Sequence, residues 1–391
     1  MKNRIIGVSY VAAAALMAAC FVSCGSSGTN DSIADDFVLS SDQDDREEIL
    51  KSLFTEGVYL TITEKSRSDP RCKEANREEL GLPDLPNGEW YYTYDNLIEG
   101  MATMEKFGTE SEDDNTNKLE IAAFLANIAQ ETGAGVDIDP VYGGLGCFIQ
   151  EGGGSARDSC IYGGCVNTPG YDDIDTCKAH GNKCPAGDIG WSGRGPHQLS
   201  WPSNYLEYGR AMGEGNSYMN DPDLLTQRSD IGIPGSIWFW GYQENSDLFP
   251  PDVPFKPSAH NVVSGSWEPT EFDVACGRTK PSLGVITNLI NGGIECGPNA
   301  TEDGRQNAAR RVLYFNAIAN AMGVQVPDGW ADDCSGQKNF QECPSYMDES
   351  SRCGVSWSVA NTTCGTLCTD KSHCPAGEEC YSDLSTVPCE I

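Results

Sequence analysis

Basic residues are scarce in this chain of 391 residues, which has 26 Lys and Arg against 58 Asp and Glu and a net charge of −32. So acidic a surface repels nucleic-acid phosphates and anionic lipid headgroups, which argues against either as a partner. A neutral or slightly cationic polymer remains compatible. The acidity could equally serve solubility alone.

Long hydrophobic runs are absent after the first two dozen residues. The one run, Val8–Val22, follows two basic residues and precedes small ones, which predicts a signal peptide over residues 1–24 rather than a membrane span. We therefore expect a secreted protein that is free of the membrane in its mature form. Because Cys20 and Cys24 each follow small residues, a lipoprotein-like anchor is the alternative.

Histidine is also scarce, with four residues, and no paired Cys-x-x-Cys units accompany matching His pairs. A metal site is therefore not expected. Cysteine is abundant: of the 18 residues, 16 remain if Cys20 and Cys24 leave with the signal. An even number of cysteines in an exported chain predicts disulfide bonds.

The composition divides the chain into segments, without an internal repeat. Residues 25–48 are rich in Gly, Ser and Asp and predict a flexible acidic linker. Residues 49–331 alternate helical stretches with Gly-rich loops and predict the main domain. Residues 332–391 contain eight cysteines and few aliphatic residues, so disulfides must stabilise this small module. Its aromatic residues would suit carbohydrate binding, while a stabilising cap or a protein-binding module are alternatives.

Apolar periodicity predicts a mainly α fold with small β pieces. Leu119–Thr132 places Ile121, Phe124 and Ile128 on one helical face. Ser236–Tyr242 and Asn307–Met322 are further predicted helices, the first of them buried.

Glu131 and Glu151 are the two carboxylates that the local pattern singles out. Glu131 lies at the carboxyl end of the apolar face of the first helix, where partial desolvation favours the protonated form that a general acid needs. An exposed glutamate at a helix end is the alternative. Glu151 precedes three glycines, on a loop that another molecule could approach closely, or on which it is a solvated charge.

Two polar, glycine-rich segments follow. The segment 193–205 reads Gly-Arg-Gly-Pro-His-Gln-Leu-Ser-Trp-Pro-Ser-Asn-Tyr, and 284–297 places Asn291 and Glu295 beside a Gly-Gly pair. Polar side chains that could hold the amide and hydroxyl groups of a sugar are Gln198, Ser200 and Asn204. Trp201 and Tyr205 could pack on sugar faces or belong to the core.

In order and spacing, these segments resemble the plant-type chitinases of glycoside hydrolase family 19. The similarity covers roughly residues 50–335 and is carried by 118–135, 146–152, 193–205 and 282–297. It implies a helical, lysozyme-like domain with a substrate cleft, and no metal or organic cofactor. The implied substrate is chitin or N-acetylglucosamine oligosaccharides, cleaved with inversion by a monomer.

The resemblance also implies roles for individual residues. Glu131 would be the general acid and Glu151 the general base, while Ser200 would help to hold the attacking water. Sugar contacts would come from Gln198, Asn204 and Asn291, beside the aromatic Trp201 and Tyr205. Glu295 and Arg311 would form an ion-pair network with the acid, supported by Gln130, which stands where the family usually has His.

By the same resemblance, Cys72 would pair with Cys147 and Cys296 with Cys334, whereas the partner of Cys276 is left open. The expected function is that of an inverting endochitinase. A chitin-binding lectin without activity and a peptidoglycan-cleaving, lysozyme-like hydrolase are the alternatives. Because both catalytic glutamates are present, the sequence favours an enzyme over a lectin.

Overall fold

The computed structural model describes residues 43–72, 90–133, 138–151, 191–241, 256–340 and 343, and the short strands 357–359 and 362–364. The predicted signal peptide, most of the predicted linker and most of the cysteine-rich module lie outside the described residues. In the described part, no helix is long and apolar enough to cross a membrane.

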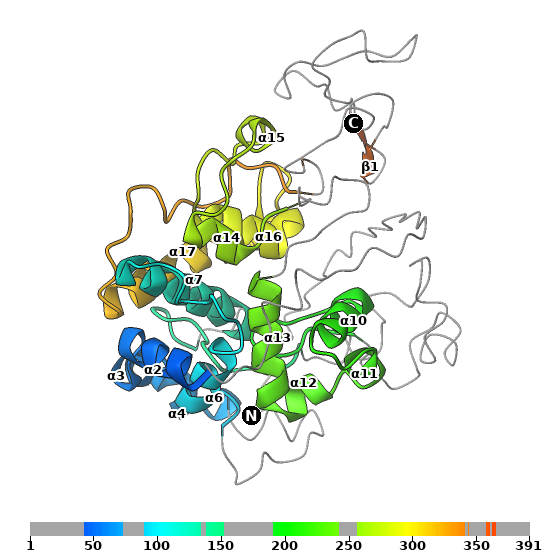
Figure 1. Cartoon of the computed structure of the whole chain (residues 1–391). Coiled ribbons are helices and arrows are strands. Elements are labelled where there is room, and N and C mark those ends of the chain that lie inside the picture. Colours follow the sequence, from blue (N-terminus) through cyan, green and yellow to red (C-terminus); the bar gives the residue numbers. More distant parts are fainter. Residues whose placement is uncertain are drawn as a thin grey trace, which may run out of the picture.

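The described chain is mainly helical, as predicted (Figure 1). The helices are α2 (Gln43–Leu53), α3 (Glu56–Ile62), α4 (Glu64–Ser68), the 3-10 helix η2 (Pro70–Cys72), α6 (Tyr94–Met101), α7 (Asp114–Gly133), α10 (Pro202–Ala211), α11 (Ser217–Asn220), α12 (Leu224–Gln227), α13 (Ser229–Gly241), α14 (Ala259–Ser264), α15 (Glu271–Ala275), α16 (Leu283–Glu295) and α17 (Glu302–Ala321). The strands β1 (Trp357–Val359) and β2 (Thr362–Cys364) form an antiparallel hairpin in register Ser358 to Thr363.

Helix α7 is the central element, buried on nearly all sides and packed along α17 (Figure 1). It begins five residues before the predicted start, because the Asp113 carboxylate accepts the backbone N–H groups of Asn115 and Thr116 in its first turn. It ends at Gly133, which packs so closely against Gly144 that a side chain on either residue would meet the other's backbone. This close packing brings the end of α7 beside the loop that carries Glu151.

The other two predicted helices are also present, each with an earlier start. Helix α17 begins at Glu302, where the hydroxyl of the N-cap residue Thr301 accepts the N–H of Gly304. Helix α13 begins at Ser229 and is buried over most of its length, including Trp238 and Trp240. The early starts of α7 and α17 follow from polar capping residues, which apolar periodicity does not register.

Besides the β1–β2 hairpin, small β pieces also occur at the site. Isolated antiparallel bridges pair Gln150 with Arg194 and Arg194 with Leu199. They join the end of the Glu151 loop to the segment 193–199, so two stretches 40 residues apart in sequence share one short β framework.

Two predicted boundaries need correction. The linker predicted to end at residue 48 overlaps helix α2, which is held by its buried Arg46 through a hydrogen bond from Nε to Ala102 O, 2.9 Å. The cysteine-rich module was predicted to begin at 332, yet Cys334 and Cys343 form disulfides with Cys296 and Cys276 of the main domain. Amphipathic packing and long-range disulfides extend the main domain at both ends.

Candidate active site

Glu131 lies in the last turn of α7, with its side chain 19% exposed. Burial raises the pKa of its carboxyl group, the adjacent Arg311 guanidinium opposes that rise, and the carboxylates of Glu295 and Glu151 add to it. A carboxylic acid that holds its proton more tightly than a free one and yet reaches solvent is suited to donate a proton to a bound molecule.

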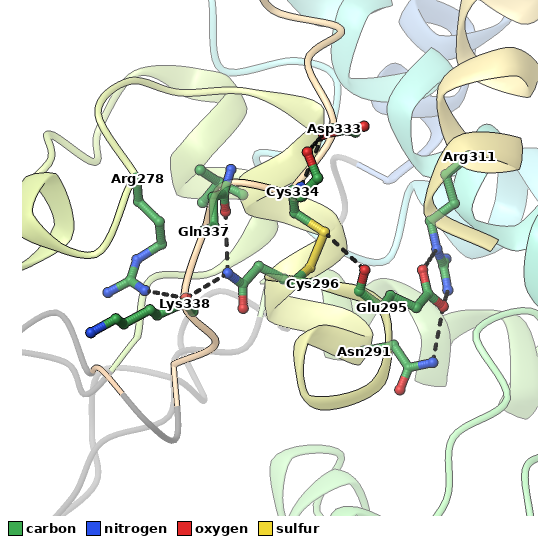
Figure 2. The surroundings of a disulfide bond; sticks show 12 residues. Arg278, Asn291, Glu295, Cys296, Arg311, Asp333, Cys334, Gln337 and Lys338 are labelled. Atoms are coloured by element: carbon green, nitrogen blue, oxygen red, sulfur yellow. Dashed lines mark hydrogen bonds and ion pairs between the residues drawn. A yellow bond between two sulfur atoms is a disulfide. The ribbon is translucent and has the colours of Figure 1, made fainter. Parts of the chain in front are cut away.

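Arg311, fully buried on α17, joins the acid to two further side chains. Its guanidinium donates to Glu131, to both oxygens of Glu295 at 2.8 and 2.9 Å, and to Asn127 Oδ1 at 2.9 Å. Asn291 Nδ2 donates to Glu295 Oε1 at 2.9 Å (Figure 2). The structure therefore brings together Glu131, Asn291, Glu295 and Arg311 from α7, α16 and α17. One buried cation holds two carboxylates in place and balances part of their charge.

Helix α16 is kinked at the position that carries Asn291. Asn291 has φ −144° and ψ 33° inside an otherwise helical stretch. A Cβ at the next residue, Gly292, would lie 2.1 Å from Asn288 Oδ1, so only glycine fits after the kink. The kink interrupts the regular spacing of the helix between Asn288 and Glu295, and Asn291 meets Glu295 directly across it.

Glu151 is half-buried on the loop that follows the Cys72–Cys147 disulfide, one of the two pairs implied by the family resemblance. Its backbone N–H donates to Gly193 O at 2.8 Å, and Glu151 Oε2 accepts the N–H of Gly193 at 3.3 Å. Its charge acts on Glu131, whose pKa it raises. The second carboxylate is thus anchored at its backbone and side chain, near the first.

Gln198 and Trp201 adopt positive φ angles of 51° and 75°, which residues other than glycine rarely do. The turn is held by hydrogen bonds from Gln198 Nε2 to Gly195 O and from Asn204 Nδ2 to Ser200 O, both 2.8 Å. Gln198, Ser200 and Asn204 are half-buried, and Trp201 is 41% exposed. An aromatic face held toward solvent beside polar groups matches the needs of sugar binding.

Tyr205 requires a correction, because it was predicted to contact the sugar and instead lies in the core, 0% exposed. Its hydroxyl donates to Ser192 O at 2.7 Å and accepts from Arg194 Nη1 at 3.0 Å. Gln130, predicted as part of the Arg311 network, is buried and makes no hydrogen bond to that network within the described ranges. Helical geometry explains this, since adjacent residues point to different sides of a helix.

Arg194 is a supporting residue that the sequence reasoning missed. It is fully buried, and it pairs with Asp223 Oδ1 through Nη2 at 2.7 Å and Nε at 3.1 Å. Its backbone forms both bridges of the small β framework, so this ion pair fixes the segment on which Glu151 rests. The available signal was an arginine between two glycines, followed by the acidic Asp221-Pro222-Asp223 motif.

Lys256 lies at a cavity that the sequence did not predict. It contributes the only charged side chain to a small cavity between α13, α14 and α16, whose other lining residues are Phe239, Trp240, Pro257, Ala259, Leu289 and Ile290. Ile290 directly precedes Asn291, so the cavity adjoins the kink in α16. Across the described residues, no three His, Cys, Asp or Glu side chains gather in a way that could hold a metal ion.

Residues 84–334 match the sequence profile of the family described as chitinase class I, which is well over half of the chain. The chain belongs to the class I chitinase family. Endochitinase CH25 of Brassica napus is 35% identical over 294 residues, 75% of this chain and 78% of that protein. Basic endochitinase B of Arabidopsis thaliana is 35% identical over 286 residues, 73% and 72% of the two chains. As a class I chitinase family member, the protein is a glycoside hydrolase.

Solved structures of this family are also similar to the chain. Chitinase C from Streptomyces griseus is 24% identical and aligns with 69% of this chain and 79% of its own, with a TM-score of 0.41. A class IV chitinase from Zea mays is 18% identical and aligns with 69% and 94%, with a TM-score of 0.42. Membership of the class I chitinase family rests on the sequence matches.

Proposed function

We propose that this protein is a secreted endochitinase that hydrolyses β-1,4 bonds between N-acetylglucosamine units with inversion at the anomeric carbon. The single observation that carries the proposal is Glu131, a partly buried acid whose pKa is raised and which is held by Arg311 within the electrostatic reach of Glu151. The family match and the similarity to proteins named endochitinases support the choice of substrate.

In the proposed mechanism, Glu131 donates its proton to the glycosidic oxygen as the bond from C1 to that oxygen breaks. Glu151 accepts a proton from a water molecule that attacks C1 from the opposite face, with the Ser200 hydroxyl helping to hold the water. After the transfer, Arg311 already donates a hydrogen bond to the new Glu131 carboxylate, so no charge has to move to stabilise it.

For substrate binding, Gln198, Asn204 and Asn291 offer amide donors and acceptors, and Trp201 offers an exposed aromatic face. The strongly acidic chain suits a neutral or deacetylated, cationic polymer better than an anionic one.

The deciding test is hydrolysis of the N-acetylglucosamine hexamer by protein that begins at Gly25. Wild type should release short oligomers with newly formed α-anomers, while Glu131→Gln and Glu151→Gln should each lose most of the activity, by about 10²-fold or more. Glu105→Gln, at an exposed glutamate away from the site, is the matched control and should retain full activity.

Other outcomes point to other functions. Tight binding of the hexamer without cleavage would make the protein a lectin. Cleavage of peptidoglycan in preference to the hexamer would make it a lysozyme-like hydrolase. Products with retained β-anomers would refute the inverting mechanism alone.

A further inference from the structure

The chain returns to the active-site half of α16 after α17. Residues 334–340 together with Cys343 are here called the C-terminal strap. The strap is joined to the main domain by the Cys296–Cys334 disulfide (Figure 2) and by the Cys276–Cys343 disulfide. Cys296 directly follows Glu295, and Gly297 N–H donates to Cys334 O at 3.1 Å. One end of the strap is therefore fastened one residue from a member of the Arg311 network.

The strap lies directly on the backbone of its neighbours. A Cβ at Gly297 would lie 2.5 Å from Gln337 O, and a Cβ at Gly277 would lie 2.3 Å from Gly336 O. Two glycines are thus required for the strap to approach this closely. The strap therefore packs tightly on the turn after α15 and on the turn after α16.

The strap also binds a side chain of α16. Asn288, which is buried, donates from Nδ2 to Gln337 Oε1 at 3.1 Å and to Lys338 O at 3.0 Å. Asn288 is three residues before the kink at Asn291, and its Oδ1 is the atom that a side chain on Gly292 would strike. The orientation of the Asn288 amide is therefore coupled to the strap on one side and to the kink on the other.

Arg278 also holds the strap, through two backbone carbonyls and one aromatic ring. The Arg278 guanidinium donates to Lys338 O at 2.8 Å and to Cys343 O, lies 4.0 Å from the centre of the Phe340 ring, and pairs with buried Asp273 at 2.8 Å. Lys338 O thus receives hydrogen bonds from both Arg278 and Asn288. The backbone next to Gln337 is held in place, so the Gln337 side chain meets Asn288 at a defined position.

We infer that Gln337 is a positioning residue for the reaction. It acts through Asn288 to hold the kink of α16, and the kink places Asn291 and Glu295 on the Arg311–Glu131 pair. The effect on KM and kcat rests on the proposed function, whereas the effect on the position of Asn291 does not. The Gln337 side chain accepts a hydrogen bond from Asn288, which is not among the side chains predicted to contact substrate, and its influence passes through that bond.

The test compares Gln337→Met, which fills a similar volume but cannot accept the hydrogen bond, with Lys338→Ala. The latter is the matched control, because Lys338 contributes its carbonyl and not its side chain. Gln337→Met should raise KM for the N-acetylglucosamine hexamer about three- to tenfold, the size of one lost hydrogen bond, with a smaller change in kcat. Lys338→Ala should match wild type.

The pH profile supplies a readout that a merely structural role would not move. Glu295 raises the pKa of Glu131 and also shares Arg311 with it. If Glu295 moves away, Glu131 is no longer repelled by the Glu295 carboxylate and interacts more strongly with the Arg311 guanidinium. Both changes lower the pKa of Glu131. The alkaline limb of the kcat/KM profile of Gln337→Met should therefore shift to lower pH. Gln337→Glu keeps an acceptor oxygen, so its KM should lie between those of wild type and Gln337→Met.

A third readout does not depend on hydrolysis. The side-chain amide resonance of Asn291 should shift in Gln337→Met and stay in place in Lys338→Ala. Should Gln337→Met fail to fold, Asn288→Asp removes the donor of the same bond and should shift the same resonance. An unchanged amide resonance together with an unchanged KM and pH limb would overturn the inference. If the wild type does not cleave the hexamer but the Asn291 resonance still shifts in Gln337→Met, the proposed function is refuted and the positioning role of Gln337 stands.

Discussion

At the residue scale, the site depends on carboxyl groups whose charge is costly to bury. Glu131 carries this cost most visibly, because burial raises its pKa although Arg311 donates to it. The folded state therefore holds the Glu131 proton more tightly than the unfolded chain does. Its contribution to the free energy of unfolding declines as pH rises from the unfolded pKa through the raised folded value.

Glu131→Gln removes the titratable carboxyl group, so the free energy of unfolding of the variant should rise relative to that of wild type as pH rises. We expect a gain on the order of 1 kcal/mol at pH 8 that shrinks toward pH 4. Urea unfolding of both proteins across that range measures it. A difference that is constant with pH would show that Glu131 has no raised pKa in the folded protein.

His197 is a buried residue whose polar ring nitrogens make no hydrogen bond to the described residues around it. It is 4% exposed between Phe124, Phe239 and Trp240, and neither ring nitrogen has a hydrogen-bond partner among the described residues. Burial, aided by the charge of Arg311, lowers its pKa to about 3, so the ring is neutral. Two buried nitrogens without partners should cost stability.

His197→Leu should therefore raise the free energy of unfolding by about 1–2 kcal/mol at pH 7, because the apolar side chain leaves no polar atom unsatisfied. His197→Ala is the contrasting variant and should destabilise through the cavity that it leaves. Chemical denaturation of the three proteins decides the matter. A destabilised Leu variant would mean that one ring nitrogen has a partner.

At the element scale, a buried histidine between two carboxylates joins α14 to α7 as a clamp. His260 Nδ1 lies 2.7 Å from Glu120 Oε1 on α7, and its Nε2 lies 2.9 Å from Glu110 Oε2. The other oxygen of Glu110, Oε1, lies 3.7 Å from Lys106 Nζ. Glu120 also accepts from Trp240 Nε1 at 2.9 Å, which adds α13 to the cluster. Burial lowers the pKa of His260, but the two carboxylates outweigh it and the net shift is upward.

His260→Gln should destabilise the protein most in acid. The folded pKa is raised, so the clamp contributes fully below the unfolded pKa of about 6.5 and fades as pH rises through the folded value. We expect a loss of about 3 kcal/mol at pH 5.5, since a buried carboxylate is left without its cation, and a smaller loss at pH 9.

Denaturant unfolding at those two pH values tests the clamp. The double variant His260→Gln with Glu120→Gln should recover part of the loss at pH 5.5, because it removes the uncompensated charge as well. An equal loss at both pH values would assign His260 a packing role only.

At the scale of the whole molecule, the main domain extends past residue 331. The C-terminal strap carries two disulfides and the contacts to Asn288 and Arg278. A chain that ends at residue 331 loses all of these, whereas one that ends at Cys343 keeps every described contact of the strap.

Truncation after residue 331 should lower stability by about 3 kcal/mol or more, the cost of losing native disulfides. Truncation after Cys343 should leave both the melting temperature and the hydrolysis of soluble oligomers near wild type. Thermal unfolding and hexamer cleavage measure the two effects. Equal stability of the two truncated chains would show that the strap contributes little to the fold.

The sequence by itself determined the helical character of the main domain and the segments that carry the site. Apolar periodicity is a local property, so it located α7 and α17 to within a few residues. The order of the glycine-rich and acidic motifs likewise pointed to Glu131, Glu151 and Asn291 before any geometry was known, because each motif is read from adjacent residues.

Only the tertiary structure decided what depends on contacts between distant segments. Tyr205 and Trp201 look alike in sequence, yet one is enclosed by Arg194 and Ser192 and the other faces solvent. The ion pair of Arg194 with Asp223 and the hydrogen bond of Gln337 with Asn288 join residues 29 and 49 positions apart. Burial, pKa and the extent of the domain follow from such long-range packing, which no local pattern encodes.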